Sequence, residues 1–474
     1  MAAHTPSGGD DRLKRSAMTV AVMSSFVTPF MASSINVALK SIDEEFSIDA
    51  VTLSWVATSY LLASAAFLVP FGRIADIRGR KKVFLYGSLV MAVASGLCAF
   101  AYDEWSLLAF RVLQGVGGAM IFGTSVAILS SVYPPNERGK ALGTAVAAVY
   151  IGLSAGPFVG GFMVAFLGWR SLFLLIVPLN LAVILVAKMK LKGEWAEASG
   201  ESFDLKGSIV YAVSLTALIL GFSMLPDLLG AVMLLLGTIG IVGFILIEVR
   251  EKHPVMDMNL FRRNRTFGFS NLAALINYSA TFAVTFMMSL YLQYVKEFSP
   301  ELTGTLLVAQ PVVMAIFSPV AGKLSDVKAP RLIASTGMAV CTVGLVMLAF
   351  FTEDTEIWAI VGVLAFLGFG FALFSSPNTN AIMGSVERRQ YGIASASVGT
   401  MRLVGQVLSM GIATLFIAVY LGDQVLSNVL AEEFMESYEI SFYVFAALCL
   451  AGVFASLARG KPDSGKSASS IAQK

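Results

Sequence analysis

The chain has 474 residues, of which 57% are hydrophobic and 14% are charged, and its formal net charge is +2. Soluble globular domains carry about a quarter charged residues, so this composition excludes an ordinary soluble globule. The charged residues gather in short patches between apolar runs that are long enough for membrane helices, which need about 20 residues each. We therefore expect an all-α polytopic membrane protein. A net charge so close to zero indicates no particular class of partner.

Cysteine and histidine usage argues against a metal centre. Cys98, Cys341 and Cys449 lie in apolar runs, where cysteine usually behaves as a small buried hydrophobe, and only two histidines exist. We expect no disulfide framework, no metal site and no cofactor. The segment 460–467 fits the phosphate-loop pattern, but no strand precedes it. We therefore expect no nucleotide site there, and we also expect no nucleic acid as a partner.

Fourteen apolar runs are predicted to cross the membrane. Their predicted ranges are 17–39, 51–71, 83–102, 105–132, 139–165, 169–188, 207–225, 228–247, 267–294, 303–321, 332–351, 357–382, 391–420 and 440–458.

The distribution of lysine and arginine tests this number of spans. With the N-terminal tail placed in the cytoplasm, 28 of the 33 lysines and arginines fall in cytoplasmic segments, as the positive-inside rule requires. Lys40, Arg170 and Lys296 fall outside, whereas Arg111 and Arg402 lie within spans. An error of one span would invert every later loop. We expect a plasma (inner) membrane protein with both termini in the cytoplasm.

A charged stretch occurs twice. The segment from Gly72 to Lys82 returns 250 residues later as the segment from Gly322 to Arg331, and each has an Asp four positions after its glycine, namely Asp76 and Asp326. We predict that each copy forms a tight polar turn between two spans. Further matches at an offset of 253 residues support two parallel repeats related by an axis along the membrane normal.

The repeat predicts a division of the chain into two halves that enclose a central cavity able to open to either side. The predicted parts are a cytoplasmic tail (1–16), an N-terminal six-helix half (17–188), a linker with two extra helices (189–266), a C-terminal six-helix half (267–458) and a second cytoplasmic tail (459–474).

The first charged turn contains an acid among cations. Gly72 permits a bend, and Asp76 can pair with a nearby arginine or accept from helix amides. The cations around it, Arg80 included, are also explained as a simple topogenic loop. Asp76 opposes that charge bias, which favours a specific role for it.

Two arginines lie inside predicted spans. Arg111 shares a helix face with Gly115 and Gly118, so its charge is expected to point toward a neighbouring helix or the cavity. An intramembrane charge costs about 2.5 to 3.5 kcal/mol on insertion scales and is a functional candidate, although a structural role is also open. Arg402, with Gln406 one turn later, is interpreted as the counterpart of Arg111 in the second half.

The fifth span carries a spaced glycine series. Glycines four residues apart let helix backbones approach closely, and a proline removes a backbone donor. Generic tight packing explains any single pair but explains the whole series poorly. The series is Gly143, Gly152, Gly156, Pro157, Gly160 and Gly161.

Together the Gly72 turn, the Arg111 stretch and the span-five series resemble the major facilitator superfamily, and within it the fourteen-span drug:proton antiporter branch of the EmrB/QacA type. The resemblance implies a fold of two six-helix halves plus two extra helices. It also implies that Asp76 with Arg80 latches the cytoplasmic gate, that Arg111 takes part in proton coupling, and that the span-five glycine face limits leakage between the halves.

One feature departs from that branch. Its first helix usually has an Asp before an Asn-Val-Ala-Leu-Pro segment, whereas residues 30–40 contain no acid and end in Lys40. The predicted spans contain no Asp or Glu at all. Coupling would then have to use Asp76, Arg111 or the substrate. Two buried arginines without a buried acid favour neutral or anionic amphiphiles.

Several uncharged polar residues near mid-span are candidates for the cavity, although each could instead make an interhelical hydrogen bond. They are Tyr60, Gln114, Asn180, Asn277, Tyr278, Gln310 and Gln406.

We expect a secondary active transporter, not an enzyme, that exports small amphiphilic molecules or drugs by alternating access, with the lipid bilayer as its solvent and the proton as coupling ion. One alternative is a facilitator or ion-coupled transporter of a specific metabolite. Another is a transporter-like sensor or scaffold that binds without flux.

Overall fold

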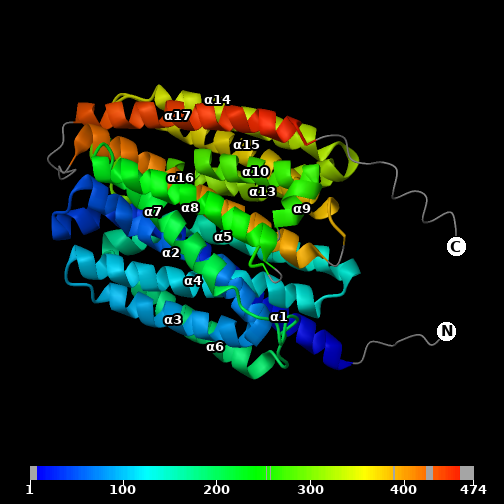
Figure 1. Cartoon of the computed structure of the whole chain (residues 1–474). Helices are drawn as coiled ribbons and strands as arrows, with labels where there is room; N and C mark the ends of the chain where they lie inside the picture. Colours follow the sequence, from blue (N-terminus) through cyan, green and yellow to red (C-terminus); the bar gives the residue numbers. More distant parts are fainter. Residues whose placement is uncertain (1–7, 252–253, 257, 388–389, 423–430, 460–474) are drawn as a thin grey trace, which may run out of the picture.

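The computed structural model describes residues 8–251, 254–256, 258–387, 390–422 and 431–459, and the regular elements within these ranges are helices. Long helices run side by side, and the described chain starts and finishes at the same end of the bundle (Figure 1). We call this the terminal end and the opposite one the far end. The C-terminal segment 460–474, with its phosphate-loop pattern, lies outside the described residues.

The helices are α1 (Gly8–Phe46), α2 (Ala50–Arg78), α3 (Arg80–Ala99), α4 (Glu104–Val132), α5 (Pro135–Leu167), α6 (Arg170–Lys190), α7 (Leu205–Ser223), α8 (Leu228–Arg250), α9 (Met258–Arg263), α10 (Arg265–Thr281), α11 (Ala283–Leu290), the π-helix η1 (Tyr291–Val295), α12 (Pro300–Leu307), α13 (Ala309–Val327), α14 (Pro330–Ala349), α15 (Ile357–Gly384), α16 (Tyr391–Leu421) and α17 (Ala431–Leu457).

Fourteen helical segments of the described chain are long and apolar enough to cross a membrane, which confirms the predicted number. Two of them combine several helices, because α10, α11 and η1 follow one another directly, as do α12 and α13. The helices extend beyond the apolar runs. α1 continues to Phe46, past the predicted end at residue 39, and α17 starts at Ala431 instead of 440.

These extensions overturn the expectation that the spans contain no acid. Asp43 lies in α1, Asp76 in α2 and Glu248 in α8, all within candidate spans. Hydropathy follows the bilayer core, whereas helices continue through the polar interfacial regions, where charged side chains can reach water. An apolar run therefore underestimates the length of its helix.

The helices pack as two bundles with α7 and α8 across the seam between them (Figure 1). In the first, α1 packs on α5 and α4 packs on α2 and α3; in the second, α10 packs on α16 and α15 packs on α13 and α14. The bundles meet where α5 contacts α12 and α13 and where α16 contacts α2. α7 contacts both α2 and α16. In α8, by contrast, only 17% of the most apolar stretch of the helix is buried. α8 therefore presents most of its surface to lipid.

The predicted charged turns are shorter than expected. α2 continues through Gly72 to Arg78, so the turn consists of Gly79 alone, at a φ of +114° that favours glycine. Gly72 lies inside this helix and so does not form the predicted turn, and a Cβ atom on it would meet nothing within 4 Å. Gly322 likewise lies inside α13. Asp326 also belongs to α13, and its side chain lies outside the described part of the structure.

Candidate functional site

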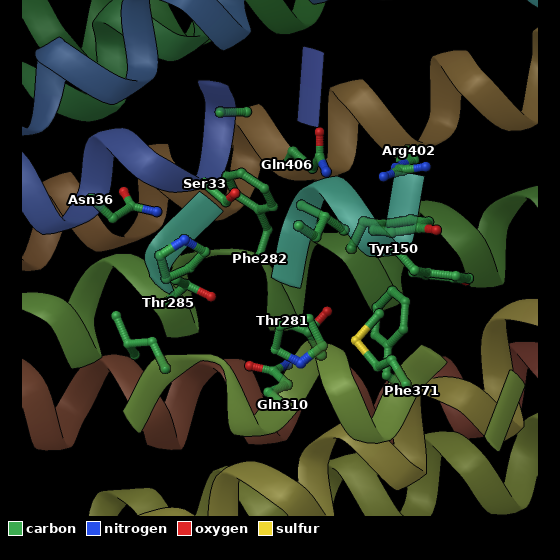
Figure 2. Close-up of a pocket in the computed structure, with 17 residues that line it drawn as sticks. Ser33, Asn36, Tyr150, Thr281, Phe282, Thr285, Gln310, Phe371, Arg402 and Gln406 are labelled. Atoms are coloured by element: carbon green, nitrogen blue, oxygen red, sulfur yellow. The ribbon is translucent and has the colours of Figure 1, made fainter. Parts of the chain in front are cut away.

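A pocket lies between the two bundles, and Figure 2 shows the residues that line it. Its walls come from α1 and α5 on one side and from α10, α11, α12, α13, α15 and α16 on the other. The cavity volume is about 90 Å³, well below the roughly 300 to 1,000 Å³ of sites for drug-sized molecules. The pocket is therefore contracted in this conformation.

The lining combines aromatic and aliphatic side chains with amides and hydroxyls, and its only charged member is Arg402. The lining residues are Ala32, Ser33, Asn36, Tyr150, Leu153, Pro157, Tyr278, Thr281, Phe282, Thr285, Leu307, Gln310, Pro311, Met314, Phe371, Arg402 and Gln406.

The polar groups are distributed unevenly along the pocket. Arg402 lies near Tyr150 and Phe371 at one end, and Asn36 lies at the other (Figure 2). The guanidinium carbon of Arg402 is 5.6 Å from the ring centroid of Tyr278, within cation–π range. Tyr278 in turn packs edge-on against Phe371 at 5.4 Å. An arginine in an aromatic surround offers one end of the pocket to an anionic or electron-rich group.

The seven predicted cavity residues divide into two groups. Tyr278, Gln310 and Gln406 line the pocket. The other four do not. Asn180 is buried on α6 and donates to Ile176 O at 3.1 Å, whereas Tyr60 and Gln114 surround Arg111.

Asn277 lies on α10, is fully buried beside Cys341 of α14, and is not among the residues that line this pocket. Several lining residues were missed by the sequence analysis, among them Asn36, Tyr150 and Thr285. An uncharged polar residue in a span gives no sign of which face of its helix meets the other bundle. Residues of this kind are found only once the helices are placed.

Arg111 is buried inside the first bundle and does not reach the pocket. Its Nε donates to Val56 O on α2 at 2.8 Å, and its Nη1 donates to Gln114 Oε1. Gln114 Nε2 in turn donates to Ser95 Oγ on α3 at 2.7 Å. The guanidinium carbon also lies 4.7 Å from the ring centroid of Tyr60. Arg111 thus joins α2, α3 and α4.

The interpretation of Arg402 as the counterpart of Arg111 is wrong. Arg402 lies on α16, the fifth span of the second bundle, whereas Arg111 lies on α4, the fourth span of the first. The offset of 253 residues pairs Arg402 with Val149 and Arg111 with Leu364. Only Arg402 lines the pocket, so the two charges have different surroundings.

The span-five glycines face two helices. Gly152, Gly156 and Gly160 pack on α1, where a Cβ atom on Gly152 would lie 2.5 Å from Phe26 O. Gly161 packs instead against the other bundle, where its Cβ would lie 2.5 Å from Pro300 O at the start of α12.

α5 and α12 cross in close contact at this point. Gly304 of α12 also lies in the crossing, because a Cβ atom on it would collide with Pro157 O. Gly143 differs from the rest of the series. A Cβ atom on it would meet nothing within 4 Å, so it does not belong to the close-packed face.

The bundles are also joined by hydrogen bonds at the far end. Among the described residues, Lys40 Nζ donates to Gln293 O at 2.8 Å, and the Tyr294 hydroxyl donates to Asp43 Oδ2 at 2.6 Å. Ser289 donates to Asn36 O at 2.6 Å one turn deeper. We call Lys40, Asp43, Gln293 and Tyr294 the far-end latch. The latch and the α5–α12 crossing close the pocket toward the far end.

Asp76 and Arg80 form an ion pair at the terminal end, with Nε of Arg80 donating to Asp76 Oδ1 at 2.8 Å. The second carboxylate on Arg80 comes from the linker between α6 and α7. Glu197 accepts from Nη1 and Nη2 at 2.7 and 3.1 Å, and Arg80 N donates to Trp195 O at 2.8 Å. In this conformation the charged turn is held by residues 191–204, which we call the linker strap.

Comparison with known proteins gives one family and several relatives. A profile of the Major Facilitator Superfamily matches residues 21–270 and 270–474. The chain is 28% identical to the riboflavin transporter RibZ of Clostridioides difficile (strain 630) over 435 residues, which cover 90% of this chain and 93% of that protein. It is 29% identical to the cephamycin export protein CmcT of Amycolatopsis lactamdurans over 458 residues, which cover 94% of this chain and 93% of that protein.

Among solved structures, the crystal structure of the human organic anion transporter MFSD10 (TETRAN) matches with a TM-score of 0.65 and 13% identity, covering 96% of this chain and 100% of that one. At this identity the likeness bears on the fold alone. The family profile, in contrast, spans nearly the whole sequence and agrees with fourteen candidate spans in two packed bundles. The chain therefore belongs to the major facilitator superfamily, whose members are membrane transporters.

Proposed function

We propose that the protein is a secondary active exporter of small amphiphilic organic molecules, neutral or anionic, that works by alternating access and proton antiport in the plasma (inner) membrane. The observation that carries this proposal is the pocket between the bundles with Arg402 as its single charged residue. A lone cation in a low-dielectric site attracts anions and repels cations. The aromatic and aliphatic walls suit an apolar body.

The lysine and arginine distribution supports a cytoplasmic location for the terminal end. The far-end latch then corresponds to a closed outer gate, so this conformation is one in which the pocket is shut off from the outside. The contracted cavity supports a resting state that must expand to take up a drug-sized molecule.

Asp43 supplies the carboxyl group that the sequence analysis missed in the first span. It is 1% exposed, its Oδ2 accepts from Tyr294, and its Oδ1 has no hydrogen-bond partner. Opening the far end separates Asp43 from Tyr294 and exposes the carboxyl to protons from outside. We propose Asp43 as the proton-coupling residue, so Asp43→Asn should leave binding intact and make export independent of the proton gradient.

Arg402 provides the test of substrate charge. Cells without their own exporters, expressing Arg402→Gln, Arg402→Lys or the unaltered protein, are loaded with anionic, neutral and cationic fluorescent amphiphiles, with and without collapse of the proton gradient. Loss of a charge-assisted hydrogen bond costs about 1.5 to 3 kcal/mol, so Arg402→Gln should reduce export of anions about tenfold or more. Neutral dyes should change little, and Arg402→Lys should restore part of the anion export.

Unchanged anion export by Arg402→Gln contradicts the proposed role of this residue, and efficient export of cations contradicts the substrate class. A second candidate function is transport of one specific metabolite, which the match to a riboflavin transporter over 90% of the chain favours. Exclusion of none of the dyes would support that alternative, and uptake of a single labelled metabolite would establish it.

A further inference from the structure

Two carboxyl groups meet at the terminal end of the α7–α8 hairpin, away from the pocket. Glu248 lies in the last turn of α8 and is 1% exposed. Asp204 is the N-cap residue of α7, at the point where the linker strap ends. Neither residue takes part in the pocket or in the far-end latch.

Each carboxyl uses one oxygen for a backbone amide. Asp204 Oδ1 accepts from Gly207 N at 2.9 Å, and Glu248 Oε2 accepts from Met256 N at 2.8 Å. The remaining oxygens, Asp204 Oδ2 and Glu248 Oε1, are buried without a hydrogen-bond partner. A Cβ atom on Gly207 would collide with both of them, so they flank the same point, and the two carboxyl groups lie within hydrogen-bonding reach of each other.

Two unpaired carboxyl oxygens this close together require a proton or a cation between them. An ionised carboxylate only accepts hydrogen bonds, and two of them in contact at a buried site repel each other. Among the described residues, the other groups that act on Glu248 are the backbone amides of Val255 and Met256, so within that part of the chain Asp204 is the charged group that faces it. A proton on either carboxyl turns that group into a donor and satisfies both oxygens at once.

We propose that Asp204 and Glu248 form a proton-binding site that shares one proton and ties the start of α7 to the segment that follows α8. The folded protein then holds a proton that the unfolded chain releases at neutral pH, so the stability of this region falls as the pH rises. Losing the proton leaves two facing negative charges and loosens the linker strap at residue 204.

Amide substitutions test the proposal because the amide nitrogen of Asn or Gln donates where the proton would. We would measure thermal unfolding of the purified full-length protein from about pH 6 to about pH 8.5 for the unaltered protein, Asp204→Asn and Glu248→Gln. The control is Asp227→Asn, since Asp227 caps the far end of the same hairpin without a side-chain hydrogen bond. Between the lowest and the highest pH, the unfolding temperature of the unaltered protein and of the control should fall by several degrees more than that of the two amide variants.

Infrared difference spectra provide a second readout that does not need transport. A protonated-carboxyl band should be present at neutral pH in the unaltered protein and absent from Glu248→Gln and Asp204→Asn. Equal pH profiles for all four proteins, or no such band, would overturn the proposal. Selective stabilisation by Na⁺ over K⁺ at high pH would also overturn it, because a metal cation would then occupy the site instead of a proton.

Discussion

Arg111 and Arg402 illustrate how one residue type acquires two roles from its surroundings. Arg111 is fully buried, donates to Val56 O and Gln114, and holds three helices of one bundle together. Arg402 is partly exposed and lines the pocket, where its guanidinium lies over the ring of Tyr278. A charge within a membrane span is costly in both cases, but of the two only Arg402 lines the pocket.

The bonding of Arg111 predicts that Arg111→Lys lowers transport about tenfold while the protein still inserts. The guanidinium fork reaches Val56 O and Gln114 from different nitrogens, and a single ammonium group cannot reproduce that geometry. Dye export per inserted molecule is the measurement. Arg12→Lys, an exposed site on the same chain, is the matched control. Wild-type export by Arg111→Lys would show that a point charge suffices at this position.

Sequence reasoning identified the polar residues within spans but could not orient them. Tyr278, Gln310 and Gln406 line the pocket, whereas Asn180 and Asn277, which have the same kind of sequence setting, do not. In a soluble helix the apolar face identifies the core, but lipid-facing and protein-facing sides of a membrane helix are both apolar. Direction therefore depends on the packing of helices far apart in the sequence.

At the scale of elements, sequence predicted the number of spans well because lipid requires long apolar helices. It predicted their ends poorly, since polar residues continue a helix beyond the bilayer core, as at Asp43 in α1 and Arg78 in α2. The same error hid the buried acids Asp43 and Glu248, which lie just past the predicted apolar runs.

Gly304 lies at the crossing of α5 and α12 and Gly143 does not, so the two glycines should respond differently to substitution by alanine. Gly304→Ala places a Cβ atom against Pro157 O, so α12 must move off α5 at a cost of about 1 to 3 kcal/mol. We expect a lower unfolding temperature and several-fold faster proton leakage through reconstituted vesicles. Gly143→Ala meets no neighbour within 4 Å and sits in a helix, so it should be neutral or stabilising by about 0.5 to 1 kcal/mol. Equal leakage from the two variants would show that this crossing does not seal the seam.

At the scale of the whole molecule, the two bundles are held together unevenly. The far-end latch adds hydrogen bonds from α1 to η1, and the α5–α12 crossing adds backbone contact beside it. At mid-depth, Tyr150 and Ser375 share a hydrogen bond of 2.9 Å across the pocket region. In the alternating-access mechanism that we propose, one end opens while the other closes, so the latch bonds would have to break in every transport cycle.

The latch therefore sets the balance between conformations, and Tyr294→Phe tests this. The substitution keeps the ring beside Lys40 but removes the hydroxyl that donates to Asp43. Losing a hydrogen bond to a charged group costs about 1.5 to 3 kcal/mol, which shifts a two-state equilibrium about 10- to 100-fold toward the state open at the far end. Tyr420→Phe, on a partly exposed tyrosine of α16, is the matched control.

Accessibility of the pocket from each side is the measurement. Cys98, Cys341 and Cys449 are buried, so a cysteine introduced at Thr285, which lines the pocket, can be labelled against a low background. A membrane-impermeant thiol reagent should label Thr285→Cys faster in right-side-out vesicles when Tyr294→Phe is also present. In inside-out vesicles, which expose the opposite face, the same reagent should label it more slowly. In Tyr294→Phe, Asp43 loses its hydrogen-bond donor but keeps its carboxyl group. If labelling becomes faster while export still depends on the proton gradient, the Tyr294 hydroxyl contributes to closing the far end but is not needed for proton coupling. Unchanged labelling from both faces would mean that the bundles are held by the α5–α12 crossing and not by the latch.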